Sequence, residues 1–311
     1  VYWNDGDRSL RKARLVRHFA EQDERTLTAA VLADFTGDGI SDLFAARNGL
    51  PPLLYAGAAG GAFESLPREV EIPGALWGSA LAVACGDVDA DQDLDLWVTH
   101  YKIPYGEGQI PEKYFDANDS EPAYLLLNDG AGSFKDATDD SGLAPKRYRR
   151  TYAASLADLD DDGDLDLVES SDFSGMDIFE NDGKGRFRDV TTEAADQVKT
   201  FGMGQALGDF NGDGLLDIYT VGMGSTTAYR LEAMGLGRPE FPEYQKMRTV
   251  MGYGNRMLLA QGPGGAGMGP ERRVFRQAPW NDQVSRTGWS WGVAALDADL
   301  ALRVQRAVGV T

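Results

Sequence analysis

The stretch Asp158–Asp166 reads Asp-Leu-Asp-Asp-Asp-Gly-Asp-Leu-Asp, and it decides how the rest of this 311-residue chain is interpreted. Carboxylates stand at loop positions 1, 3, 5 and 9, and Gly163 stands at position 6. Like charges this close together repel one another unless a cation lies among them. Alternating oxygen ligands, with a glycine that permits a sharp turn, suit Ca²⁺. The alternative is an acidic turn that is simply solvated.

The same pattern recurs at 34–42, 87–95 and 209–217, so the chain contains a tandem repeat. Each copy is followed by an apolar pair in the same register and continues as a strand. The loops therefore have the ligand spacing of an EF-hand loop, but they are expected in β-hairpins. A fifth copy, at 297–305, lacks the ligands at positions 5 and 9, and we expect no metal there.

The four intact loops supply the predicted ligands of about four Ca²⁺ ions. Position 3 is Thr36 in the first loop and Asn211 in the fourth, and Gln92 replaces the glycine of the second loop. The predicted ligands are Asp34, Thr36, Asp38, Ile40 and Asp42; Asp87, Asp89, Asp91, Asp93 and Asp95; Asp158, Asp160, Asp162, Asp164 and Asp166; and Asp209, Asn211, Asp213, Leu215 and Asp217.

A second repeated hairpin is marked by Asn-Asp-Gly turns. The segment 1–10 aligns without a gap onto 125–134 and 178–187, and each copy reads as a strand, the turn and a second strand that opens on a large apolar residue. Residues 1–19 are therefore predicted to be an outer hairpin without its inner hairpin in front of it. In the first complete repeat, the outer hairpin is expected to run from Leu53–Tyr55 to Phe63–Ser65.

Repeats of four antiparallel strands arranged radially make a β-propeller. We predict an all-β chain that is one propeller domain, 1–311, with five four-stranded antiparallel blades and a ring closed by the N-terminal strands. The alternative is seven blades, with part of the chain missing; Val1 begins in mid-strand, so we expect a processed or trimmed N-terminus. The predicted units are blade 1 at 28–72, blade 2 at 79–139, blade 3 at 152–192, blade 4 at 204–278, and the last blade from 289–310 (inner hairpin) and 1–19 (outer hairpin).

Two insertions, near 101–121 and 220–254, enlarge the second and fourth repeats. Because strand direction alternates, the acidic loops should lie on one face of the ring and both insertions on the other. Inserted loops on a rigid scaffold commonly bind partners; the alternative is that they fold back as caps. Aromatic and Arg side chains dominate interface energies. The predicted contacts with a protein partner are Tyr101, Tyr105, Tyr114, Arg149 and Tyr244.

A basic run, Lys146–Arg150, is expected on the same face, where it is either solvated or meets an acidic partner. Composition excludes several other classes of function. The net charge of −19 argues against nucleic acid, whose phosphates require a basic surface, and no apolar run is long enough for a transmembrane segment. Cys85 is the only cysteine, so no disulfide framework is expected.

An enzyme is not expected. His18 and His100 are the only histidines, and the chain has no HExxH motif. Catalysis at a Ca²⁺ ion with Lys or Tyr, as in some polysaccharide lyases, is the enzymatic alternative that the sequence leaves open.

With these motifs, the chain resembles the FG-GAP/VCBS-repeat propellers seen in integrin α heads, and more closely those of the cartilage acidic protein type. Phe201-Gly202 followed by Gly208-Asp-Phe-Asn-Gly-Asp-Gly214 carries the FG-GAP signature almost whole, and Asn181–Thr191 matches a hairpin of the cartilage acidic branch. The resemblance implies a propeller with Ca²⁺ in the loop between the first and second strands of a blade. It also implies an extracellular or periplasmic location and a role in adhesion or protein association.

The chain departs from these propellers in its degenerate fifth loop and in its blade count, because they more often have seven blades. The residues and the resemblance together favour a calcium-stabilised interaction or scaffold propeller that associates with other proteins, as a subunit of a larger complex or in adhesion. The alternative is a carbohydrate-binding or carbohydrate-active, lyase-like propeller that uses exposed aromatic side chains, with a glycan as its partner.

Overall fold

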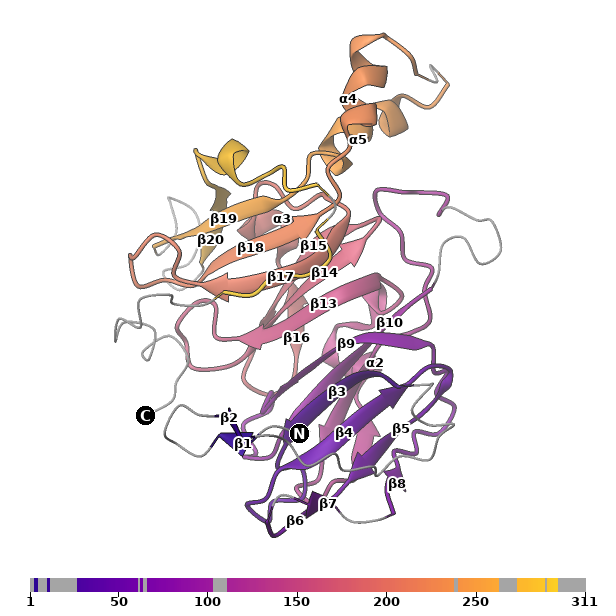
Figure 1. Cartoon of the computed structure of the whole chain (residues 1–311), viewed down its shortest axis with the longest axis vertical. Coiled ribbons are helices and arrows are strands. Elements are labelled where there is room, and N and C mark those ends of the chain that lie inside the picture. Colours follow the sequence, from indigo (N-terminus) through magenta and orange to yellow (C-terminus); the bar gives the residue numbers. More distant parts are fainter. Residues whose placement is uncertain are drawn as a thin grey trace.

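The computed structural model describes residues 3–4, 10–11, 27–60, 62–63, 66–102, 111–237, 240–262, 273–288 and 290–295, which form mainly β-strands (Figure 1). The strands are β1 (Trp3–Asn4), β2 (Leu10–Arg11), β3 (Leu27–Ala33), β4 (Asp42–Arg47), β5 (Leu50–Tyr55), β6 (Gly57–Ala58), β7 (Ala62–Phe63), β8 (Arg68–Glu69), β9 (Ser79–Gly86), β10 (Asp95–Tyr101), β11 (Tyr124–Asn128), β12 (Phe134–Asp136), β13 (Arg150–Ala157), β14 (Asp166–Asp172), β15 (Gly175–Asn181), β16 (Phe187–Asp189), β17 (Gly202–Gly208), β18 (Asp217–Gly222), β19 (Arg256–Gln261) and β20 (Val274–Gln277).

Helices occur only in connections within the described ranges. The α-helices are α2 (Thr138–Ser141), α3 (Thr191–Ala194), α4 (Thr226–Ala233) and α5 (Pro242–Met251), and the 3₁₀ helices are η1 (Ala144–Lys146) and η2 (Asn281–Gln283). None of the helices in these ranges has the length and apolar character that crossing a membrane requires.

Four four-stranded sheets follow one another along the chain, in the orders β3-β4-β5-β8, β9-β10-β11-β12, β13-β14-β15-β16 and β17-β18-β19-β20. Neighbouring strands in each sheet are antiparallel. The first strands lie side by side, because β9 contacts both β3 and β13, and β13 also contacts β17. Figure 1 shows the sheets in sequence order from indigo to yellow. Antiparallel four-stranded sheets whose first strands meet at the inside are the blades of a β-propeller.

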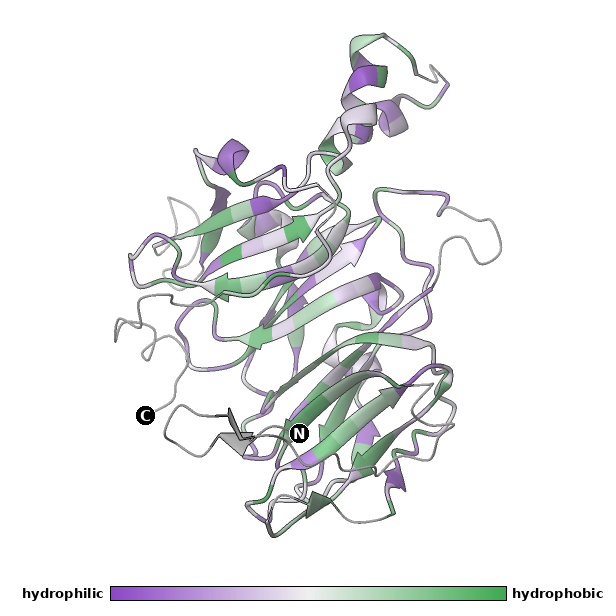
Figure 2. Ribbon diagram, in the orientation of Figure 1, coloured by the Kyte–Doolittle hydropathy of each residue, from purple (hydrophilic) through white to green (hydrophobic). Residues whose placement is uncertain are grey.

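Apolar side chains fill the spaces between neighbouring blades, and the ribbon of Figure 2 is coloured green at hydrophobic residues along the strands. Every residue of β10 and β14 is buried, because a second strand is covered by a neighbouring blade on each face. First strands such as β13 are instead half-buried and rich in small residues, as the crowding near the axis requires. The three inter-blade clusters include Phe44 with Leu96, Trp97 with Phe179, and Val168 with Ile218.

The order of the connections confirms the predicted repeat. The acidic loops 34–42, 87–95, 158–166 and 209–217 each join the first and second strands of a blade. Both insertions join second and third strands, from β10 to β11 and from β18 to β19. In an antiparallel sheet these two kinds of connection lie at opposite ends of the strands. The acidic loops and the insertions therefore lie on opposite faces of the propeller.

The fourth strand of the first blade differs from the prediction. It is β8, which pairs with β5 through Leu53↔Glu69 and Leu54↔Arg68, whereas β6 and β7 form a separate two-stranded ribbon. The Gly57 N–H donates to Asp42 Oδ1 at 2.7 Å, as the equivalent residues of the other blades do to their own aspartates. The backbone also comes very close to Ser41 here, because a Cβ at Gly57 would lie 2.4 Å from the Ser41 carbonyl oxygen. The chain leaves the sheet at this close approach and returns to it as β8.

The predicted last blade lies largely outside the described residues. Within 1–19, β1 and β2 pair as an antiparallel hairpin, with Trp3 opposite Arg11, as the turn predicts. Of the predicted inner hairpin 289–310, only 290–295 is described, and it has no assigned strand. Gly292 Cα lies 3.5 Å from the position that a Cβ would take on Gly204, so this segment runs beside β17. Closure of the ring by the N-terminal strands stays a prediction.

Candidate functional sites: acidic loops and a groove between the insertions

The acidic loops turn sharply at position 6, as the sequence predicts. Gly39, Gly163 and Gly214 have φ values of +83°, +97° and +89° there. Gln92 takes the same left-handed conformation in the second loop, with φ of +76°. A non-glycine residue in this region costs about 1–2 kcal/mol. The second loop therefore keeps the common turn in spite of its side chain.

The aspartate at position 9 ties each loop to the third strand of its blade or, in the first blade, to Gly57 just beyond that strand. In the third loop, the Asp166 carboxylate accepts the Leu159 N–H at 3.1 Å and the Asn181 N–H at 2.9 Å. The aspartates that accept the equivalent pair of N–H groups in the other blades are Asp42, Asp95 and Asp217. All four side chains are buried. The sequence predicts these residues only as ligands, and the structure adds that they hold the loops in place.

Aspartates at positions 1 and 5 shape the loops from within. The position-1 aspartates accept the backbone N–H of position 6, and they are Asp34, Asp87, Asp158 and Asp209. The position-5 aspartates accept the backbone N–H of position 7, and they are Asp38, Asp91, Asp162 and Asp213. Ile40 and Leu215, at position 7, can offer a cation only their backbone carbonyl oxygens.

Burial and mutual repulsion disfavour the charged forms of several carboxyl groups in the second and third loops. Burial raises the pKa of Asp166 to about 8 and that of Asp95 to about 7, although hydrogen bonds from backbone N–H groups oppose both shifts. Burial, and then the neighbouring carboxylates, raise the pKa of Asp93, Asp160 and Asp164 to about 6. A divalent cation among these groups would favour their charged forms.

Buried oxygens without hydrogen-bond partners are concentrated in these two loops. Among the described residues, eight buried side-chain N or O atoms have no hydrogen-bond partner, and six of them belong to predicted ligands. The six are Thr36 Oγ1, Asp87 Oδ1, Asp89 Oδ1, Asp93 Oδ1, Asp160 Oδ1 and Asp164 Oδ1. Buried polar groups are normally paired, and contact with a cation would satisfy these oxygens.

The second and third loops also bring their carboxylates closest together. Oxygens of Asp87, Asp89 and Asp95 lie within 4.8 Å of one another, as do those of Asp158, Asp160 and Asp162. In the part of the chain that the structure describes, neither 34–42 nor 209–217 gathers three acidic groups this closely. Asn211 Nδ2 donates to Asp213 Oδ2 at 2.9 Å, so this predicted ligand is satisfied within its own loop.

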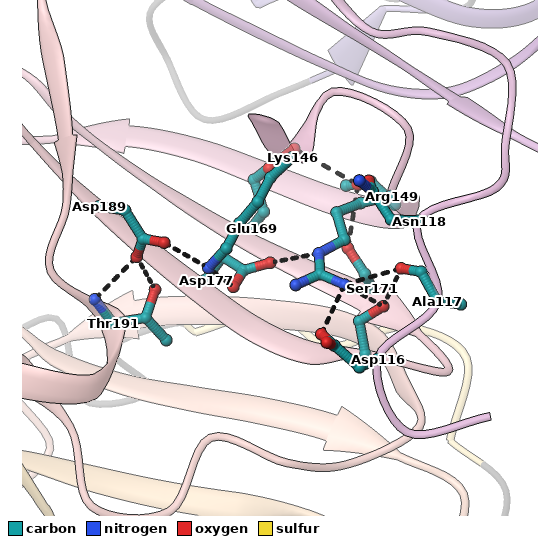
Figure 3. Close-up of polar contacts among 12 residues, drawn as sticks. Asp116, Ala117, Asn118, Lys146, Arg149, Glu169, Ser171, Asp177, Asp189 and Thr191 are labelled. Atoms are coloured by element: carbon teal, nitrogen blue, oxygen red, sulfur yellow. Dashed lines mark hydrogen bonds and ion pairs between the residues drawn. The ribbon is translucent and has the colours of Figure 1, made fainter. Parts of the chain in front are cut away.

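The basic run Lys146–Arg150 is paired inside the protein, and Figure 3 shows its contacts around Asp177. Arg149 Nη1 lies 2.9 Å from Asp116 Oδ1, and Arg149 Nε lies 3.1 Å from Asp177 Oδ2. Arg150 donates to both carboxylate oxygens of Asp119 at 2.8 Å. The run is therefore neither a solvated face nor a site for an acidic partner, because it fastens the first insertion to the third blade.

The fastened insertion forms one wall of a groove. Helices α4 and α5 of the second insertion project from the ring as a helical hairpin (Figure 1), and a groove of about 400 Å³ lies between them and the first insertion. Its lining residues are Tyr114, Phe201, Met223, Ser225, Thr227, Ala228, Leu231, Phe241, Tyr244, Gln245, Arg248 and Gly252. A volume of this size is typical of ligand pockets.

Aromatic rings make the groove wall continuous. The Tyr114 ring centroid lies 6.3 Å from that of Phe201 and 5.4 Å from that of Tyr244, and Phe241 lies 5.6 Å from Tyr244. The Tyr114 hydroxyl donates to the Tyr244 carbonyl, and the Tyr244 hydroxyl donates to the Glu112 carbonyl. The wall therefore offers ring surface rather than free hydroxyl donors.

The structure divides the predicted partner contacts into three groups. Tyr114 and Tyr244 are half-buried and come together in the groove. Tyr101 and Arg149 are only 7% and 6% exposed, and Tyr101 donates to Asp172 Oδ2 at 3.0 Å, so the prediction that these two contact a partner is wrong. Tyr105 lies outside the described residues.

The sequence prediction missed Phe201, Phe241 and Arg248 in the groove. A signal was present for two of them. Phe241, Tyr244 and Arg248 follow an i, i+3, i+7 spacing, which places side chains on one face of a helix. Phe201 could be found only from the fold, because it reaches the groove from the start of the fourth blade.

Comparison with known proteins identifies repeats in two regions of the chain. Residues 34–98 and 158–220 match the model of the FG-GAP-like repeat. The chain therefore carries FG-GAP-like repeats, and these two regions contain all four intact acidic loops. No curated protein sequence matches the chain significantly.

Solved structures resemble the chain at a distance. A lectin of Agrocybe aegerita, described as recognising non-reducing terminal N-acetylglucosamine, is 15% identical with a TM-score of 0.31, over 85% of this chain and 68% of the lectin. The biofilm matrix protein Bap1 of V. cholerae is 17% identical with a TM-score of 0.31, over 63% of this chain and 28% of Bap1. BBS1N, in complex with ARL6DN, is 9% identical with a TM-score of 0.27, over 77% of each chain.

The buried bonds of Asp166 can be tested without a cation. Asp166→Ala removes the acceptor of two buried N–H groups, and each such loss costs about 1–3 kcal/mol. We expect the free energy of unfolding, measured by urea denaturation in EGTA, to fall by roughly 2–4 kcal/mol. Asp140→Ala, at an exposed position of α2, should change it by less than about 0.5 kcal/mol. Equal effects of the two substitutions would contradict the role given to Asp166.

Proposed function

We propose that this chain is a calcium-stabilised interaction propeller that acts outside the cytoplasm, as a scaffold subunit or adhesion module. The observation that carries the proposal is the aromatic groove between the two insertions, on the face opposite the acidic loops. Cations would hold one face rigid, and the groove on the other face would receive a protein partner. The chain would have no catalytic role and no nucleic-acid partner.

The second and third acidic loops would hold Ca²⁺ best. Asp87, Asp89 and Asp93 in one loop, and Asp160 and Asp164 in the other, have buried oxygens that lack hydrogen-bond partners. A bound Ca²⁺ would neutralise their mutual repulsion and satisfy these oxygens. The first and fourth loops would bind more weakly, because each has fewer carboxylates.

Exposed apolar side chains extend the groove toward the tip of the helical hairpin. Met234, Leu236 and Phe241 are 65%, 49% and 48% exposed, and the last of them also lines the groove. Such a run of exposed apolar surface is typical of a site for protein association. Arg248 also lines the groove, but its Nη1 lies 3.9 Å from Glu232 Oε2 and donates to the Leu236 carbonyl, so its charge is used within the second insertion. A partner segment with an apolar anchor would complement the exposed apolar surface.

The finer family resemblance is consistent with this role. Within the FG-GAP repeat proteins, we place the chain nearest to the cartilage acidic protein type and to integrin α heads, on the motifs at Phe201–Gly214 and Asn181–Thr191. Relatives of these types would act in the extracellular space or the periplasm. Calcium loops of moderate affinity suit those compartments.

A glycan is the second candidate ligand, because ring faces in the groove wall could stack against sugars, and Gln245 and Thr227 could supply polar contacts. The groove favours a protein segment, since the hydroxyls of Tyr114 and Tyr244 already bond to backbone carbonyls. A panel of polysaccharides separates the two candidates. Retention or depolymerisation of a polysaccharide by the wild-type chain, abolished by Tyr244→Ala, would favour the carbohydrate alternative.

Calcium removal tests the metal. A site with a Kd of about 10⁻⁴ M should stabilise the folded state by about 2.7 kcal/mol at about 10 mM Ca²⁺. We expect the melting temperature to rise with Ca²⁺ and to fall when EGTA is added, with a smaller rise in Asp160→Asn than in the exposed control Asp140→Asn. A melting temperature that does not respond to Ca²⁺, in protein freed of metal, would refute the calcium assignment.

Groove substitutions test the docking site. Phe241→Ala and Tyr244→Ala remove apolar anchors, and such residues contribute about 2 kcal/mol or more at interfaces, or about 30-fold in affinity. A partner isolated with the wild-type chain from its native source should therefore bind these variants at least about 30-fold more weakly, by biolayer interferometry.

The matched control for the docking site is Leu66→Ala, which removes an 81%-exposed apolar side chain of the first blade, far from the groove residues in the sequence. It should leave the affinity for the partner unchanged. The melting temperatures of all three variants should stay close to that of the wild type. Equal affinity of the groove variants and the wild type would exclude the groove as the docking site.

A further inference from the structure

Each of the first three acidic loops is contacted by a side chain from the next blade. Asn128 Nδ2 donates to the Phe35 carbonyl at 3.0 Å, and Asn181 Nδ2 donates to the Val88 carbonyl at 2.8 Å. Arg273 Nε donates to the Leu159 carbonyl at 3.3 Å. The acceptor is the carbonyl of loop position 2 in all three cases. Because this contact recurs at the same loop position in three blades, it is a regular feature of the propeller.

The contacted carbonyl belongs to the peptide that precedes the position-3 ligand. In the first loop, this peptide is held at both ends, since its carbonyl accepts from Asn128 and its N–H, on Thr36, donates to Asp42 Oδ2 at 2.9 Å. The side chains that follow the peptide carry the unpartnered buried oxygens Thr36 Oγ1, Asp89 Oδ1 and Asp160 Oδ1. The inter-blade bond therefore orients the residue whose unpartnered oxygen would contact a bound cation.

The two asparagines also bond to the loop of their own blade. The Asn128 backbone N–H donates to Asp95 Oδ1 at 2.9 Å, and the Asn181 backbone N–H donates to Asp166 Oδ1 at 2.9 Å. Both aspartates are at position 9. Each asparagine thus joins the position-9 carboxylate of one loop to the position-2 carbonyl of the loop before it. The bonds run without a break from the third loop, through the second, to the first.

The Asn-Asp-Gly turn fixes the asparagine side chain for this task. Asn128 Oδ1 accepts the Asp129 N–H at 3.0 Å and the Gly132 N–H at 3.1 Å, which leaves Nδ2 directed at the neighbouring loop. The turn of the third blade also meets the second loop directly, because the Gly185 N–H donates to the Val88 carbonyl at 2.8 Å. An aspartate in place of the asparagine would lack the donor, and an alanine would lack both groups.

We propose that Asn128 and Asn181 are positioning residues that couple cation binding in neighbouring blades, an inference that rests on the proposed binding of Ca²⁺. A cation in the third loop fixes Asp166, which holds Asn181 and, through its side chain, the peptide before Asp89 in the second loop. The second loop is then already partly ordered, so it loses less conformational entropy when it binds its own cation. Coupling between two sites is reciprocal, so filling the second loop strengthens binding in the third.

The fourth loop provides the contrast. Among the described residues, no side chain from another blade contacts its position-2 carbonyl, on Phe210, and its position-3 Asn211 bonds within the loop. Its binding should therefore be independent of Asn128 and Asn181.

A double-mutant cycle on the full chain tests the coupling, with calorimetric titration of Ca²⁺. Asp38→Asn and Asp213→Asn first silence the outer loops, so that only the second and third remain. Asp160→Asn then silences the third loop. With Asn181 present, this change should weaken binding in the second loop about 5-fold or more, which is the lower range of typical coupling. With Asn181→Ala, the same change should leave the second loop's affinity unaltered.

The control is Asn118→Ala, which removes an exposed asparagine of the first insertion that donates to the Pro145 carbonyl. Coupling in this variant should equal that of the parent. If silencing the third loop has the same effect on the second loop with and without Asn181, the proposed coupling is wrong while the calcium sites stand. If no variant binds Ca²⁺, the calcium assignment itself fails, and the inference fails with it.

A second pair of loops keeps the test decisive where Asn181→Ala does not fold, as judged by circular dichroism. With the third and fourth loops silenced instead, by Asp160→Asn and Asp213→Asn, Asn128→Ala should uncouple the first loop from the second. The expected result is the same about 5-fold dependence of the first loop on the second, lost when Asn128 is replaced. Retention of that dependence in Asn128→Ala would overturn the proposal.

Discussion

The two hydrogen bonds that each position-9 aspartate accepts from the backbone are the contacts on which the other features of this propeller depend. In the third blade, Asp166 joins its own loop, through Leu159, to the start of the Asn-Asp-Gly turn, through Asn181. The carboxylate must be buried to make both bonds, and burial disfavours its charge. The same geometry that closes the blade therefore gathers negative charge that a divalent cation can neutralise. The fold and the proposed metal affinity would therefore follow from the same constraint.

Much of this fold could be predicted from the repeated acidic loops. Each nine-residue loop is followed by an apolar pair at the same two positions, and this regularity indicates that every copy forms the same hairpin. The sequence could not show where the first blade departs from the pattern. That departure begins at Gly57, whose backbone approaches Ser41 more closely than a Cβ atom would allow. The approach reserves 57–63 for a small ribbon and leaves the fourth strand to β8. A close backbone contact leaves no periodic signal in a sequence.

The binding face was only partly predictable, for a physical reason. The insertions were placed correctly on one face by strand order, and Tyr114 and Tyr244 do come together there. The prediction for Arg149 was wrong because the first insertion brings its own carboxylate, Asp116, against that arginine. Which charges pair within an insertion depends on its three-dimensional path rather than on composition. The helical spacing of Phe241 and Arg248 was present in the sequence, but its use in a groove became evident only from the fold.

The central claim is that the acidic loops are cation sites built into the propeller. A crystal structure of the chain grown with Ca²⁺, with anomalous scattering used to identify the ion, tests this most directly. The account predicts ions in the loops 87–95 and 158–166, with oxygen ligands at about 2.3–2.6 Å that include Asp89 and Asp160. Loops that keep their carboxylate oxygens unpartnered, with no anomalous peak among them at millimolar Ca²⁺, would contradict it.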